Sequence, residues 1–239
     1  MIGTYLNAAG IVVGGLAGLA WRRPLSNRTQ HFFKNALGLL IVPCGLVLVA
    51  IGLKGPFLAG LKQFGVVLLS LSLGKLLGRL LQLQKTSNRI GQFARERMAE
   101  NRPGADFMTG FKVCTALFCV APIGILGAAH DGLSGYFAPL LIKAAMDALA
   151  VMGFIPMFGW GVMFAAVPVL VVQGSISLLC ARYALPFLEA HQLGGSVQAT
   201  GGMLIFCVAL VLFDIRKIHV TDYLPSLVVA PLLTWWWLR

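Results

Sequence analysis

The sequence predicts an all-α integral membrane protein with about eight transmembrane helices, or seven. Of its 239 residues, 58% are hydrophobic and only 11% are charged, and the mean hydropathy is +0.85. A soluble domain is about 45–50% apolar and about 25% charged, and a water-soluble chain of this length could not cover so much apolar surface. The apolar segments are continuous rather than alternating, which favours helices over a membrane barrel. This composition argues against a soluble enzyme, a nucleic-acid-binding protein and a secreted disulfide-bonded scaffold.

A helix needs roughly 20 apolar residues to cross a hydrocarbon core about 30 Å thick. The segments that meet this requirement are residues 2–21, 35–53, 57–80, 108–129, 136–157, 160–181, 198–215 and 222–238. The first is expected to be a retained span and not a signal peptide, because Arg22 and Arg23 follow the apolar run instead of preceding it. The seventh is short and the third ends in Lys75 and Arg79, which leaves seven spans as the alternative.

The distribution of basic residues predicts that both termini lie outside the cell. In this orientation the inner side holds the Arg22–Arg23 pair, the basic segment 84–107 and the Arg216–Lys217 pair. The outer side keeps only scattered basic residues, which are Lys54, Lys62, Arg182 and Arg239. An excess of Lys and Arg inside is what the positive-inside rule requires. It explains the net charge of +11 without nucleic acid as a partner.

The chain is expected to form a single transmembrane domain, residues 1–239. Residues 1–83 hold the first three spans, 84–107 a basic cytoplasmic linker, 108–158 a central pair of spans and 159–239 the last three. Apolar residues recur at near-helical spacing in the linker, which is either a short helix on the anionic inner leaflet or a solvated connection.

An inverted repeat of spans one to three and six to eight around the central pair is one interpretation of the sequence. The first span aligned on the sixth pairs Gly15 with Gly174, and the second aligned on the seventh pairs Cys44 with Cys207. Partner spans are an odd number of crossings apart, so the repeats would run in opposite directions, as in alternating-access carriers. Chance matching of apolar segments is the alternative.

Two ionisable residues of opposite charge occur within the fifth span. An ionisable group at membrane depth costs at least ~2.5 kcal/mol on insertion scales, so each needs a reason. Lys143 precedes Asp147 by one helical turn, so both lie on the same face. They form either a structural ion pair that offsets the cost of desolvation or a functional pair in which Asp147 binds a cation or proton and Lys143 competes for it.

Polar residues also mark the neighbouring spans. Asp131 lies in the segment 130–135, which is expected to be either an outer vestibule that attracts cations or an ordinary polar turn. In the sixth span, Gln173, Gly174 and Ser175 follow a proline, and this set either lines a polar path in a kinked helix or serves helix packing alone.

Small residues and cysteines complete the pattern. In the first span, Gly10, Gly14 and Gly18 form a ridge that permits close helix packing, within the chain or between copies in a homo-oligomer. The five cysteines lie in apolar stretches without Cys-x-x-Cys spacing, so no disulfide framework, metal or cofactor is expected.

Several motifs occur together and in a fixed order. They are residues 1–4 with Asn7, Gly124 with Gly127, residues 131–135, Lys143 with Asp147, and Pro168 with residues 173–175. Over essentially the whole chain the sequence resembles the YdfK/YqgA-type family of uncharacterised bacterial inner-membrane proteins. The resemblance implies a multi-pass protein of the bacterial inner (plasma) membrane and names no substrate.

The favoured function is a small secondary transporter or channel for an ion or small polar solute, with the lipid bilayer and that solute as partners. Asp147 would be the binding or coupling carboxylate and Lys143 its counter-ion. The candidate binding residues are Asp147, Lys143, Gln173, Ser175, Asp131 and Gly174. No catalytic residue is expected, because the acids, histidines and serines form no recognisable acid–base or metal constellation. The alternatives are a structural or assembly protein and, behind it, a lipid-modifying enzyme.

Overall fold

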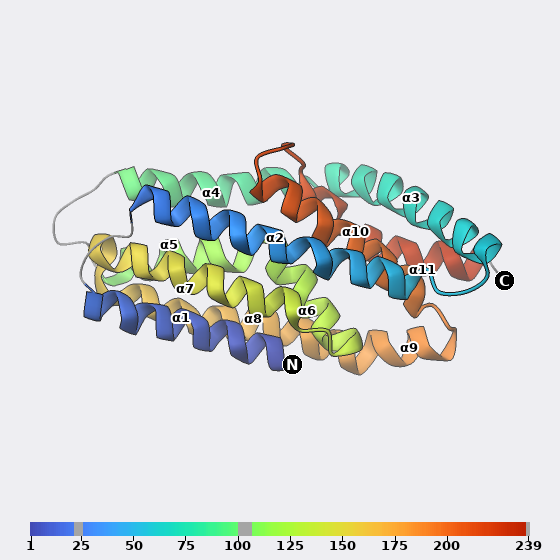
Figure 1. Ribbon diagram of the computed structural model, residues 1–239, viewed down its shortest axis with the longest axis horizontal. Helices are drawn as coiled ribbons and strands as arrows, with labels where there is room; N and C mark the ends of the chain where they lie inside the picture. The colour runs from blue at the N-terminus through green and yellow to red at the C-terminus, as the bar shows by residue number, and fades with distance from the viewer. Residues whose placement is uncertain (22–25, 100–106, 238–239) are drawn as a thin grey trace. The chain divides into compact units, whose positions relative to one another are not determined.

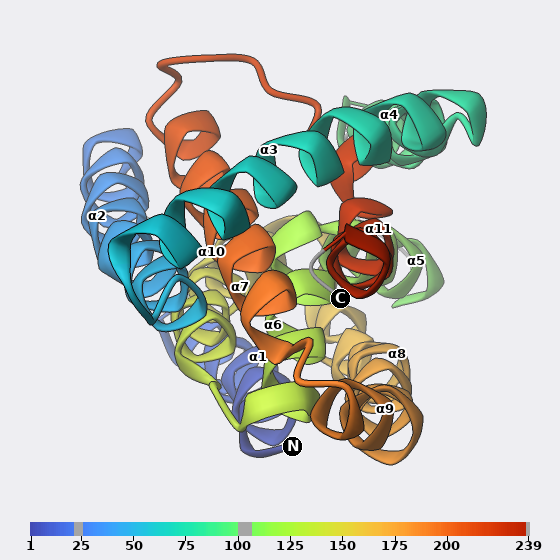
Figure 2. The ribbon, with the colours of Figure 1, turned by 90° about the vertical axis from the view of Figure 1, so that its right-hand side faces the viewer.

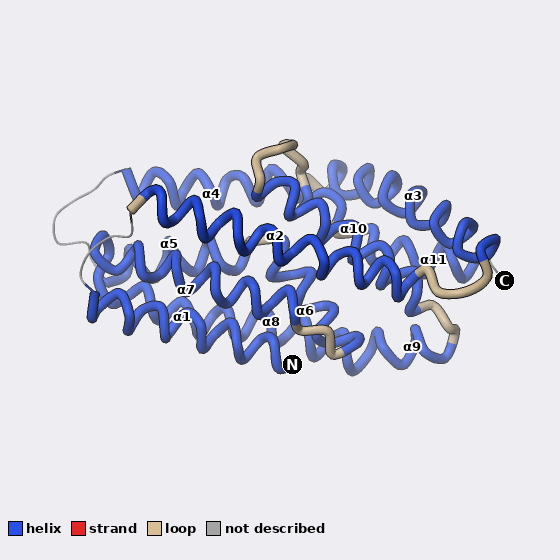
Figure 3. The backbone as a smooth tube through the Cα atoms, in the orientation of Figure 1, coloured by secondary structure: helices blue, strands red, loops and turns tan. Residues whose placement is uncertain are grey.

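The computed structural model describes residues 1–21, 26–99 and 107–237. All regular secondary structure in these ranges is helical, as predicted (Figures 1 and 3). The Arg22–Arg23 pair and Arg239, on which part of the predicted orientation rests, lie outside the described residues.

The α-helices are α1 (Ile2–Trp21), α2 (Asn27–Gly52), α3 (Phe57–Leu80), α4 (Leu83–Ala99), α5 (Phe107–Val120), α6 (Pro122–Ser134), α7 (Ala138–Phe158), α8 (Ala166–Leu179), α9 (Leu185–Ala190), α10 (Gly194–Leu212) and α11 (Ser226–Trp237). The shorter elements are the 3₁₀ helices η1 (Gly159–Ala165) and η3 (Val220–Tyr223) and the π-helix η2 (Cys180–Ala184).

Several helices are long and apolar enough to cross a membrane. In the described part of the chain there are five such candidate spans, or six if the bent pair α5–α6 is counted as one span. The five are Ile2–Trp21, Arg28–Gly52, Phe57–Leu80, Ala138–Ala190 and Gly194–Leu212. The protein is therefore a multi-pass, all-α membrane protein, and the number of crossings stays a prediction.

The 53-residue candidate Ala138–Ala190 contains both α7 and α8. The chain reverses its direction between these two helices at η1 (Figure 1). Gly159 makes the reversal possible, because its φ of +69° is a conformation that residues with a side chain rarely adopt.

The fourth predicted span, residues 108–129, is not one straight helix. Helices α5 and α6 meet at an angle of 59° at a break between Val120 and Pro122. The break follows from Pro122, which lacks the N–H needed to continue the hydrogen bonds of α5. Helix α6 then continues to Ser134 and ends at Gly135, whose φ is +67°, so most of the expected 130–135 turn is helical.

The chain divides into two compact units, which are described separately. The first comprises Met1–Leu37 and Ser87–Leu178, and the second comprises Gly38–Thr86 and Leu179–Arg239.

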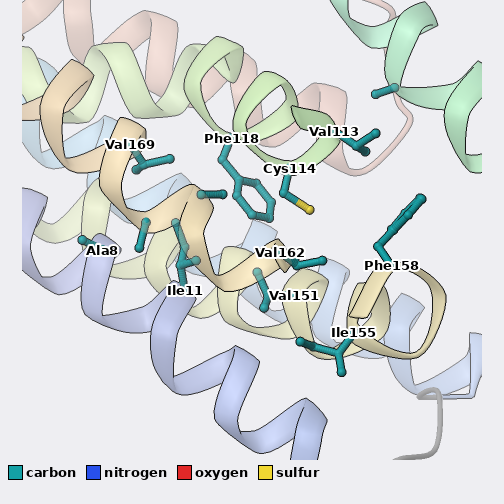
Figure 4. Close-up of a cluster of buried hydrophobic side chains, with 13 residues drawn as sticks. Ala8, Ile11, Val113, Cys114, Phe118, Val151, Ile155, Phe158, Val162 and Val169 are labelled. Carbon is teal, nitrogen blue, oxygen red and sulfur yellow. The ribbon is translucent and has the colours of Figure 1, made fainter. Parts of the chain in front are cut away.

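In the first unit, α1 packs along α7 through the predicted glycine ridge. A Cβ atom on Gly10 would lie 2.8 Å from the carbonyl oxygen of Ala144, and one on Gly14 would collide with the backbone of Ala148. The prediction that this ridge serves close packing within the chain is confirmed. A hydrophobic cluster from α1, α4, α5, α7, η1 and α8 fills the same unit and includes Ile11, Phe118 and Val151 (Figure 4).

In the second unit, α3 packs against both α10 and α11 (Figures 1 and 2). Helix α2 crosses α10 at small residues, since a Cβ atom on Gly45 would lie 2.7 Å from the carbonyl oxygen of Gly202. The start of α4 is fixed to the same unit because Asp222 accepts a 2.9 Å hydrogen bond from the backbone N–H of Gln84.

Residues 83–99 of the predicted basic linker form helix α4. Among the side chains of α4 whose burial the structure describes, only Ala94 is buried, whereas the basic side chains Lys85, Arg89, Arg95 and Arg97 are exposed. Of the two interpretations of the linker, the helical one is confirmed for these residues. The position of this helix on the inner leaflet stays a prediction.

Candidate functional site

An ion pair lies buried in the first unit. The ammonium group of Lys143 donates a hydrogen bond to Oδ2 of Asp147, one turn further along α7. Lys143 is 1% exposed and Asp147 is 7% exposed. The i,i+4 spacing seen in the sequence therefore brings the two charges together in the interior.

Two amide side chains from distant helices meet beside this pair. Nδ2 of Asn7 on α1 donates a 3.1 Å hydrogen bond to Oε1 of Gln173 on α8, and both residues are buried. The Asn7 amide also lies beside the Asp147 carboxylate. Oδ1 of Asn7 and Nε2 of Gln173 have no hydrogen-bond partner among the described residues. Since buried polar atoms are nearly always paired, these two atoms are available to a further group.

The α5–α6 break adjoins the same cluster. A Cβ atom on Gly124, in the first turn of α6, would lie 2.8 Å from Cε of Lys143 and 3.0 Å from Nε2 of Gln173. On the other side of the break, the ring of Phe118 has its centroid 5.6 Å from the Lys143 ammonium group, a separation at which a cation is attracted to the ring face. Lys143 therefore lies where the helix is interrupted, and a side chain at position 124 would displace the ends of Lys143 and Gln173.

A second charged contact lies toward the other end of α6. Asp131 is 3% exposed, and its Oδ2 accepts a 3.3 Å hydrogen bond from the backbone N–H of Thr4, while Oδ1 lies 3.2 Å from the Met1 amino group. The neighbouring His130 is fully buried, and neither ring nitrogen has a hydrogen-bond partner in the described part of the chain. Asp131 thus ties α1 to α6 and is not open to solvent.

The remaining predicted site residues lie on different faces of α8. Gly174 is buried and faces α1, with its Cβ position 3.8 Å from Cγ2 of Thr4. Ser175 is exposed and lies outside the cluster. Ser177, and not Ser175, is the serine that lies on the same face of α8 as Gln173, one helical turn away. Its hydroxyl donates a 2.7 Å hydrogen bond to the carbonyl oxygen of Ala128.

The structure adds residues that the sequence reasoning did not assign to a site, namely Thr4, Asn7, Phe118, Gly124 and Ser177. A helical-face criterion would have found Ser177, and the presence of an amide within the apolar first span was the signal for Asn7.

The cluster brings together several kinds of polar group. It combines one cation, one carboxylate, two amides and the end of a helix. Among the residues that the structure describes, no group of three or more His, Cys, Asp or Glu side chains is placed to hold a metal ion.

Apolar helices around a buried polar cluster define a multi-pass membrane protein with an ionic centre in its interior. Residues 2–235 match the family described as "Protein of unknown function (DUF554)", and the chain belongs to this family. The family resemblance found in the sequence is thereby confirmed.

Two relatives match over nearly their whole length. The "Uncharacterized membrane protein YdfK" of Bacillus subtilis (strain 168) is 26% identical over 234 residues, which cover 98% of this chain and 95% of the relative. The "Uncharacterized protein YqgA" of Escherichia coli (strain K12) is 27% identical over 240 residues, which cover 99% and 97%. No solved structure matches this chain.

Proposed function

We propose that this protein is a small secondary transporter or channel for an ion or small polar solute, with the Lys143–Asp147 pair as its binding and coupling centre. The observation that carries the proposal is a buried ion pair beside two buried amide atoms that have no partner in the part of the chain that the structure describes. A network that served structure alone would satisfy its own members, because an unpaired polar atom in a low-dielectric interior is costly. A network that binds a solute has donor and acceptor atoms that pair with the solute instead of with each other.

The broken span supports the same function. Membrane proteins tolerate interrupted helices where the exposed backbone is buried in protein or lines a polar path, and carriers place such breaks at their binding sites. Here Lys143 and Gln173 converge on Gly124, directly after the break.

The helix directions support alternating access. Helices α2 and α10, which the sequence pairs as repeat partners, cross in opposite directions, since Gly45 meets Gly202 whereas the later Gly52 meets the earlier Gly195. Partners that run antiparallel are what an inverted repeat requires. The proposal accordingly includes this repeat, a bacterial inner-membrane location and both termini outside, and it includes no enzymatic reaction.

The charge of the cluster suggests how binding and release are coupled. In the structure Lys143 and Asp147 neutralise each other. A proton or cation that binds to Asp147 releases Lys143, and the freed charge then changes the affinity of the site for a second ion or solute.

The experiment compares purified wild-type protein, Asp147→Asn and the matched control Glu189→Gln in proteoliposomes. Glu189 is an exposed acid on α9 in the second unit, whereas the cluster lies in the first unit. Jumps in protons, sodium, potassium and a panel of small acids, amines and neutral solutes are followed by charge movement on a solid-supported membrane and by an internal pH dye.

We expect at least one solute to give a signal in wild type and Glu189→Gln that is absent in folded Asp147→Asn. Silence of wild type in both readouts, or full activity of Asp147→Asn, would contradict the proposal.

A further inference from the structure

We propose that the solute is a small monovalent anion, which binds between Gly124, Gln173 and Lys143 and enters together with one proton. This inference rests on the proposed transport function and names the class of its substrate.

The first step is the position of the α6 N-terminus. Helix α6 has 13 residues and begins at Pro122, and the preceding Ala121 receives no side-chain cap from the described residues. The N-terminal end of a helix carries about half a positive charge, which attracts anions. In α6 this attraction comes from the helix dipole, because Pro122 has no N–H and the N–H of Gly124 donates a 2.9 Å hydrogen bond to the carbonyl oxygen of Ala121. In carriers, half-helices aim this end at the anionic groups of their substrates.

A second and independent observation lies on α8. Gln173 is 2% exposed, and its Nε2 donor has no partner among the described residues. That nitrogen lies 3.0 Å from the Cβ position of Gly124. A buried N–H donor without an acceptor, directed at the start of α6, is matched by a ligand that accepts hydrogen bonds.

The positive charge of Lys143 determines that the proposed site binds an anion. Its Cε lies 2.8 Å from the same Cβ position, so an ammonium group, a helix N-terminus and an amide donor converge where the chain has no side chain. A cation placed there would face three positive or donor groups. Within the described cluster the compensating charge is Asp147, because Asp131 pairs with the Met1 amino group toward the opposite end of α6.

The Asp147 carboxylate therefore occupies the place of an anionic ligand of Lys143. An entering anion displaces it and would leave a net negative charge in the interior, which is costly. One proton taken up on the released Asp147 carboxylate restores neutrality, and no other bond forms or breaks. Anion and proton thus move together without net charge, so the internal pH dye and not the current reports the transport.

The test uses the sodium salts of formate, acetate, lactate and chloride as probes, at constant sodium and ionic strength, with methylammonium, potassium and glycerol as the cationic and neutral comparison. Binding is measured as the shift of thermal stability of the purified protein, and transport as the dye signal in proteoliposomes, corrected for empty liposomes.

The variants are Gly124→Ala, whose methyl group displaces the ends of Lys143 and Gln173, and Gln173→Glu, which places a carboxylate beside Lys143 in a side chain of the same shape. The matched control is Gly65→Ala, because nothing lies within 4 Å of that Cβ position on α3. We expect at least one anion to stabilise and to be transported by wild type and Gly65→Ala, with an affinity about tenfold or more weaker in both site variants.

The outcomes separate the two proposals. Transport of cations or neutral solutes with all four anions inert overturns the anion assignment and leaves the transporter standing. Silence toward every solute overturns both. Equal anion binding in Gln173→Glu and wild type overturns this site even if Gly124→Ala does not fold.

Discussion

The side-chain nitrogen of Asn7 lies 3.1 Å from the side-chain oxygen of Gln173, and this hydrogen bond joins α1 to α8 across 166 positions of sequence. It holds both amides in an orientation that leaves one acceptor and one donor unpaired among the described residues. The bond therefore positions the Gln173 donor toward which the proposed solute is directed.

A double-mutant cycle of Asn7→Leu and Gln173→Leu measures the strength of this bond. Hydrogen bonds between membrane helices average about 0.6 kcal/mol and reach almost 2 kcal/mol. We expect a coupling energy in this range from the free energies of unfolding in mixed micelles. Additive effects of the two substitutions would show that the bond does not form.

Replacement of one member of the ion pair should be far more damaging than replacement of both. Lys143→Met and Asp147→Leu each leave a buried charge without its partner, at a cost of about 3–5 kcal/mol. The double variant should regain most of this free energy of unfolding and still fail to transport. A double variant that is stable and fully functional in the cell would instead favour a structural or assembly role. The control is Lys62→Met, because Lys62 is an exposed lysine on α3.

A methyl group on Gly14 should separate α1 from α7. Its Cβ would lie 2.5 Å from the Cα of Ala148, a backbone atom that cannot move without shifting α7. Overpacking of this kind costs about 1–3 kcal/mol. We expect Gly14→Ala to lower the unfolding temperature in detergent, whereas Gly65→Ala should leave it unchanged or raised, since alanine is the better helix former.

The predicted orientation places the C-terminus outside the inner membrane. Alkaline phosphatase fused after the last residue should therefore be active in cells, and green fluorescent protein at the same point should be dark. A fusion within the exposed basic helix α4 should give the reverse result, because the positive-inside rule assigns α4 to the cytoplasm. Identical behaviour of both fusion sites would refute the orientation.

The helical class, the glycine ridge and the Lys143–Asp147 contact could all be predicted from the sequence, because each rests on composition or on spacing within one helix. The bend of 59° between α5 and α6 occurs at Pro122. It was not predicted, because the apolar residues continue through the proline and were interpreted as one span.

The partners within the site could not be predicted in this way. Spacing says nothing about which residue of α8 meets Asn7, because that contact depends on how two distant helices rotate and pack. The same reason separates Ser175 from Ser177, since the face of α8 that points inward is fixed by its neighbours. Gly124 is also distinguished only by what surrounds it.

The close approach of Lys143 and Gln173 to Gly124 has a consequence for natural variation within this family. A side chain at that position would displace the ends of Lys143 and Gln173, so we expect a lineage that acquires one to lose the proposed site while it keeps the helical scaffold. Position 124 is therefore expected to be glycine in the members of the family that retain the proposed site, and to carry a side chain in members that have turned the same scaffold to another purpose.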